Sequence, residues 1–207
     1  MISSKEEQLV QQEDAAKFFE QALQAAIHRQ GFRPCHETTL YLRKLLTDYV
    51  HSDKLFDYSE DGVQLKPLAG LYADAVQAKS IERRDSLLRR LGDVALFIAG
   101  LFPQSLSRSL VDIDYYINMG GSAYGYLADS RRISTGASAF PLIFRELSDH
   151  FAGFVDVLAE VADSTTLAND KDALRLYEMW LCSGSTNAAG KLHKLGIVPV
   201  QIKRQAH

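Results

Sequence analysis

The chain has 207 residues, a length at which one compact domain buries roughly 70% of its unfolded surface, so a single core is sufficient. Its 26 acidic and 23 basic residues give a formal net charge of −3, which provides no overall field toward nucleic acid or an anionic membrane. The longest apolar run, residues 94–102, is far shorter than the ~20 residues that span a bilayer, so no membrane helix is expected.

The amino-terminal residues lack the features of a secretion signal. They are acidic and polar, whereas a signal peptide is basic and then apolar. The two cysteines, Cys35 and Cys182, are far apart and form no C-x-x-C pair, which is typical of reduced thiols. We therefore expect a cytoplasmic protein in which both thiols are free.

The first half of the chain has apolar residues at helical spacing. A capping box at Ser4 and Glu7 opens a helix that runs to about residue 29. Three more helices are expected, at residues 36–50, 68–79 and 81–102. Between the first two of these, Ser59-Glu60-Asp61-Gly62 is a turn signature. The segment before Pro67 is otherwise expected to be loop.

The chain is organised around residues 91–129, in which the apolar run 94–102 precedes a segment rich in tyrosine and glycine. The helix that ends before Pro103 is apolar on all sides in its last turns, which is typical of a buried helix. The next helix carries Gly120 and Gly121 in its core stripe, where each glycine costs about 1 kcal/mol relative to alanine. Close approach of another helix, a kink, or a ligand on the bare backbone would each compensate for that cost.

The second half predicts two further helices after a serine- and glycine-rich loop at residues 130–141. One helix covers residues 141–162, and Asp170 caps the last one. Residues 196–207 are expected to form a short extended or disordered tail. No repeat and no convincing run of alternating strands is present. The predicted fold is all-α: one domain over residues 1–195, a bundle of about six or seven helices with a buried central helix pair.

A mixed polar and aromatic stripe follows the core stripe of the glycine-containing helix. Its members are Asp112, Tyr115, Met119, Ser122 and Tyr126, and Asp93 on the preceding helix is the candidate sixth member. Buried phenols and carboxylates need partners, so this stripe is the expected binding surface for a protein partner or a small polar ligand. The alternative is structural: Arg89 or Arg90 pairs with Asp93, and the phenols bond to loop backbone.

Other patterns predict little chemistry. Arg131 and Arg132 lead a loop onto a helix amino terminus, an arrangement that binds anions, but no phosphate-binding motif accompanies them. Cys35 starts a helix, where the macrodipole lowers a thiol pKa, but a nucleophile also needs a positioned base, and neighbours in sequence seldom supply that geometry. Asp112 and Asp114 point away from each other on a helix and cannot share an ion. We expect neither a metal nor a cofactor.

A basic cluster lies on the long central helix, at Arg83, Arg84, Arg89 and Arg90. Glu82, Asp85 and Asp93 are interleaved with it, and opposite charges four residues apart on a helix attract each other. A solvated, internally paired face is therefore expected, and nucleic-acid binding is not expected.

The run LGDVALFIAGLFPQSLSRSLVDIDYYINMGGSAYGYL resembles a family of helical bacterial proteins. The resemblance covers the middle third of the chain and implies a helical fold, but it carries no activity, cofactor or catalytic residue. No complete set of acid, base and nucleophile is present in the sequence. We therefore expect a non-enzymatic interaction or regulatory protein. The alternatives are a small-ligand-binding protein and an enzyme that uses Asp112 and Tyr115.

Overall fold

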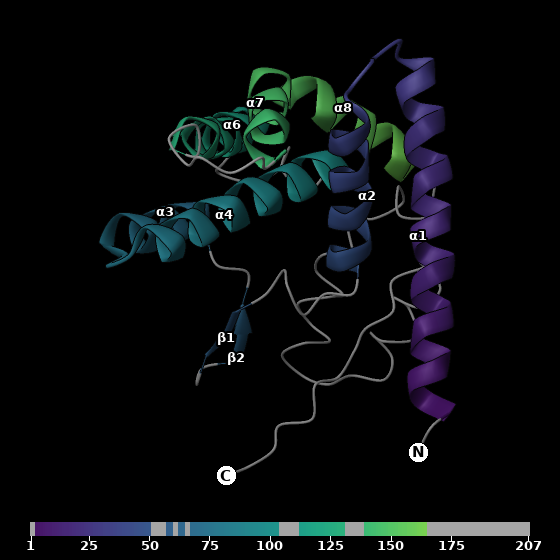
Figure 1. Cartoon of the computed structure of the whole chain (residues 1–207), viewed down its shortest axis with the longest axis horizontal. Helices are drawn as coiled ribbons and strands as arrows, with labels where there is room; N and C mark the ends of the chain where they lie inside the picture. The colour runs from purple at the N-terminus through teal and green to yellow at the C-terminus, as the bar shows by residue number, and fades with distance from the viewer. Residues whose placement is uncertain are drawn as a thin grey trace.

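The computed structural model describes residues 3–50, 57–59, 62–64, 67–103, 112–130 and 139–164. These ranges contain seven helices and one short hairpin (Figure 1). The helices are α1 (Ser3–Arg29), α2 (His36–Val50), α3 (Leu68–Gln77), α4 (Ile81–Leu101), α6 (Ile113–Ser130), α7 (Phe140–Asp149) and α8 (Phe151–Asp163). None of them combines the length and the apolar character that a membrane span requires. The predicted all-α fold is confirmed.

The hairpin pairs β1 (Asp57–Ser59) with β2 (Gly62–Gln64) in antiparallel register. Ser59 and Gly62, the two residues of the predicted turn signature that the structure describes, pair with each other at the end of this hairpin, where only loop was expected. Within the described ranges, β1 and β2 are the only strands, and they form one two-stranded sheet.

Helix α4 is the centre of the core. Ser80 caps its start, where the Ser80 hydroxyl accepts the backbone N–H of Arg83 at 3.2 Å, and Pro103 follows its end. Residues 91–101 are all buried. Helices α3, α6 and α8 pack around α4, while α1 and α2 lie side by side (Figure 1). The predicted buried central pair is α4 with α6.

The glycine pair of α6 serves close packing at one of its two positions. A Cβ atom added to Gly120 would lie 2.4 Å from Cζ of Phe151 and 2.8 Å from Cβ of Ala95. A Cβ atom added to Gly121 would lie no closer than 3.7 Å to a neighbour, an ordinary van der Waals contact. Of the three explanations for these glycines, close packing therefore accounts for Gly120.

The single helix predicted at residues 141–162 is instead two helices. The backbone of His150 leaves the helical region, with φ −121° and ψ 27°, between α7 and α8. This bend lets α7 pack along α6 and α8 pack along α4. The apolar pattern continues through the bend, so periodicity alone did not reveal it.

Several expectations concern residues outside the described ranges. They are the anion site at Arg131 and Arg132, the helix capped by Asp170, the thiol of Cys182 and the tail at residues 196–207. The predicted boundary between domain and tail falls there too, and stays a prediction.

Candidate functional site

The predicted stripe on α6 divides into two parts. Met119, Ser122 and Tyr126 line a cleft that also involves α3 and α4. Asp112 and Tyr115 are not part of this lining. The carboxylate of Asp112 accepts the backbone N–H of Tyr115 at 3.1 Å, the usual contact of a helix cap, and its side chain is exposed. The structure therefore gives Asp112 a position at the start of α6, away from the cleft.

The cleft has a volume of about 460 Å³ and is formed by one stripe from each of three helices. Tyr72, Ala75 and Val76 come from α3, and Arg84 and Leu88 come from α4. Met119, Ser122, Ala123 and Tyr126 come from α6. Spacings of three and four residues place the members of each stripe on one helix face. The walls are mainly apolar.

Helix α3 is apolar on two faces. Leu68, Leu71 and Ala75 are buried against the core, as in an ordinary amphipathic helix. Tyr72 and Val76, however, are 52% and 65% exposed and lie on the cleft. Across the cleft, Tyr126 is 41% exposed. In the sequence, Tyr72 and Val76 form a second apolar pair four residues apart. No cleft is predicted from this pair, because the spacing of the core stripe alone indicates the helix.

Arg84 is the one cationic side chain in this lining. Its Cζ atom lies 5.0 Å from the centroid of the Tyr126 ring, which favours a cation–π interaction. The Nε atom of Arg84 is buried and makes no hydrogen bond within the described part of the chain. A buried N–H group without an acceptor costs roughly 1–3 kcal/mol.

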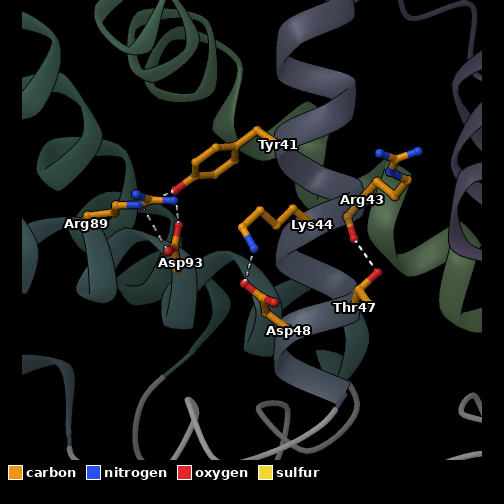
Figure 2. A network of polar contacts seen from close by, with 7 residues as sticks. All are labelled: Tyr41, Arg43, Lys44, Thr47, Asp48, Arg89 and Asp93. Atoms are coloured by element: carbon orange, nitrogen blue, oxygen red, sulfur yellow. Dashed lines mark hydrogen bonds and ion pairs between the residues drawn. The ribbon is translucent and has the colours of Figure 1, made fainter. Parts of the chain in front are cut away.

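Asp93 lies in a separate, buried network that joins α2, α4 and α6. The hydroxyls of Tyr41 and Tyr124 donate to its Oδ1 atom at 2.5 Å and 2.7 Å. Arg89 Nε lies 3.8 Å from Asp93 Oδ2 and donates to the Tyr41 hydroxyl at 3.1 Å. Figure 2 shows Arg89 and Tyr41 converging on Asp93 from two helices. The sequence is compatible with two roles for Asp93, a binding site or a structural ion pair with Arg89 or Arg90. The contact with Arg89 is that structural ion pair.

Burial controls the protonation of this network. It raises the pKa of Asp93, and the hydrogen bonds from Tyr41 and Tyr124 act in the opposite direction. Burial, followed by the charge of Asp93, also raises the pKa of both tyrosines well above the ordinary value. Both phenols therefore keep their protons and act as donors. Since Tyr124 is 0% exposed and Asp93 is buried, the arrangement is suited to holding helices together.

The expectation of a lowered thiol pKa at Cys35 is wrong. The carboxylate of Glu146 accepts the backbone N–H of Cys35 at 3.0 Å, and its negative charge raises the pKa of the thiol. The charge of Glu37 acts in the same direction. A carboxylate thus occupies the helix start at which the macrodipole was expected to favour a thiolate. Cys35 is a free, exposed thiol.

No metal-binding cluster is formed within the described ranges, where no three His, Cys, Asp or Glu residues are suitably placed. The carboxylate of Asp48 on α2 lies 3.1 Å from the ammonium group of Lys44, one turn earlier on the same helix. On the same helix the Thr47 hydroxyl donates to the Arg43 carbonyl at 2.8 Å (Figure 2).

Comparison with known proteins adds no relative: no family model matches the chain, and neither a curated protein nor a solved structure is significantly similar to it.

Proposed function

We propose that the protein is a non-enzymatic interaction protein whose binding surface is the cleft between α3, α4 and α6. The observation that carries the proposal is the exposure of Tyr72 and Val76 on a helix that already packs through its other face. The exposed part of an apolar side chain does not stabilise the isolated fold, and contiguous exposed apolar side chains mark interaction sites. A partner that covers them explains why they are there.

The proposed occupant is an amphipathic helix of a partner protein. Such a helix binds a groove through apolar residues at spacings of three, four and seven. The α6 wall has that spacing itself, from Met119 to Tyr126. Ala75 and Ala123 are small enough to admit a helix closely, and the flexible thioether of Met119 adapts to irregular side chains.

The chemistry of the lining argues against an enzyme. Its described members carry a guanidinium, a serine hydroxyl and phenols, but no carboxylate, imidazole or thiol. A nucleophile requires an adjacent base, and acid–base catalysis requires a group that titrates near neutral pH. The alternative enzyme site at Asp112 and Tyr115 also loses support, because Asp112 caps α6. The volume of about 460 Å³ falls in the range of small-molecule pockets, which keeps a small ligand as the second candidate.

Selection of displayed helical peptides against the full-length chain tests the proposal. We expect the selected peptides to bind the wild-type protein, and to lose at least about tenfold in affinity on Val76→Asp, because a carboxylate replaces an apolar contact. Leu142→Asp is the matched control, since Leu142 is 74% exposed and is not part of the lining. It should bind like the wild type.

Two outcomes would contradict the proposal. Peptides that bind both variants equally would place the interaction elsewhere on the surface. If no peptide binds but a small apolar dye does, and Val76→Asp abolishes dye binding, the cleft is a small-ligand site instead.

A further inference from the structure

We infer that the helix bound in the cleft carries a carboxylate that pairs with Arg84; this inference rests on the proposed function. The expected partner helix thus has an acidic residue beside its apolar stripe, and a helix with the apolar stripe alone should bind less tightly.

The side chain of Arg84 lies in the wall of the cleft. Its guanidinium lies over the Tyr126 ring, so α6 holds it at the cleft wall. Its Nε atom is shielded from water and has no acceptor in the described part of the chain. The side chain as a whole is only partly buried and lines the cleft, so a bound partner can reach the terminal N–H groups of its guanidinium.

The other charges near Arg84 do not supply this acceptor. Asp85, the next residue, is 5% exposed and lies about 100° around the helix, on a face turned toward the interior. Arg89, which lies further along α4, differs from Arg84 because it donates to Tyr41 and faces Asp93. The described lining contains no acidic side chain. Among the lining residues that the structure describes, Arg84 is therefore the one charged side chain, and its surroundings are mainly apolar.

A carboxylate fits this group best. The guanidinium is planar and presents its N–H groups as a fork, which matches the two oxygens of a carboxylate. Pairing would become stronger once the bound helix excludes water from the space between the ring of Tyr126 and the apolar walls. An aspartate or glutamate on the partner helix would accept hydrogen bonds from the terminal N–H groups of Arg84 and fix the direction in which the helix lies.

The test is a double-mutant cycle on peptides selected with the full-length protein. We expect the wild-type selection to enrich aspartate or glutamate at one position next to the apolar stripe. Replacing that residue by its amide should weaken binding to the wild type at least about tenfold, but binding to Arg84→Met less than about twofold. On Arg84→Lys, which keeps the charge but loses the fork, the amide replacement should weaken binding by a factor between those for the wild type and Arg84→Met.

Arg83→Met is the matched control, because Arg83 is exposed on the same helix and lies outside the lining. It should leave the effect of the amide replacement unchanged. Thermal melts of each variant establish that it is folded before affinities are compared.

The outcomes separate this inference from the proposed function. Peptides that depend on Val76 but show no acidic preference, or an amide effect that persists on Arg84→Met, overturn the pairing with Arg84 and leave the cleft as a binding site. If no selected peptide depends on Val76, the proposed function fails and the pairing fails with it.

Discussion

The ring of Phe151 lies against the bare backbone of Gly120, so closely that a Cβ atom at Gly120 would be 2.4 Å from Cζ of the ring. Ala95 of α4 closes the other side of the same point. Helices α4, α6 and α8 therefore meet where only a glycine fits. The cleft depends on this junction, because it fixes the position of α6 relative to α4.

The first prediction compares the two glycines of α6. Gly120→Ala should lower the free energy of unfolding by up to about 2 kcal/mol, because overpacking costs ~1–3 kcal/mol and alanine regains only ~1 kcal/mol of helix propensity. Gly121→Ala, with its nearest contact at 3.7 Å, should be neutral or stabilising by up to ~1 kcal/mol. Urea denaturation of both variants measures this. Equal effects at the two positions would contradict the packing assignment.

The second prediction concerns the phenols that donate to Asp93. Tyr124→Phe should lower the free energy of unfolding by about 1–3 kcal/mol, because it removes a hydrogen bond to a buried carboxylate. Tyr41→Phe should cost at least as much, since the Tyr41 hydroxyl also accepts from Arg89. The control is Tyr126→Phe, in which the hydroxyl belongs to a side chain that is 41% exposed and should matter little. A cost at Tyr126 as large as that at Tyr124 would argue against a special role for the network.

The third prediction is a pH dependence that arises from Asp93. Burial raises the pKa of its carboxyl in the folded state, so the folded chain holds this proton more tightly than the unfolded chain. The resulting stabilisation is complete below the ordinary pKa of about 4 and is lost as the pH rises through the raised folded value. The unfolding free energy of the wild type minus that of Asp93→Asn should therefore decrease as the pH rises through this interval. Denaturation curves at several pH values measure this difference. An increase of the difference with pH would mean that folding lowers the pKa of Asp93, which contradicts the prediction.

The fourth prediction concerns the exposed thiol of Cys35. Removing the neighbouring charge in Glu146→Gln should lower the thiol pKa and speed alkylation of Cys35 by iodoacetamide near pH 8, because the thiolate is the reacting form. Glu37→Gln should act in the same direction but more weakly. Mass spectrometry of the peptide that contains Cys35 gives the rate separately from any other thiol. An unchanged rate in Glu146→Gln would show that this carboxylate does not control the thiol.

Much of the fold could be predicted because the strongest signals were local. The apolar run 94–102 indicated a buried helix, and residues 91–101 of α4 are buried. Ser80 marked the start of that helix, and residues 36–50 match α2. The bend at His150 was missed because no proline or glycine marks it and the apolar spacing continues across it.

The candidate site was predictable only in part, because it combines helices that are distant in the sequence. Met119, Ser122 and Tyr126 share one face of α6, which spacing alone indicated. Their opposition to Tyr72 depends on how α3 and α6 pack on α4, which no local pattern specifies. Asp93 was grouped with the same stripe because a sequence does not show which side of α4 meets which side of α6.

The most direct test of the binding cleft is methyl NMR of the full-length chain during titration with the tightest selected peptide. The cleft predicts that the methyl signals of Val76, Leu88 and Met119 shift together and saturate at one peptide per chain, while those of Leu142 on α7 stay in place. Saturating binding that shifts Leu142 and leaves Val76, Leu88 and Met119 unchanged would contradict it.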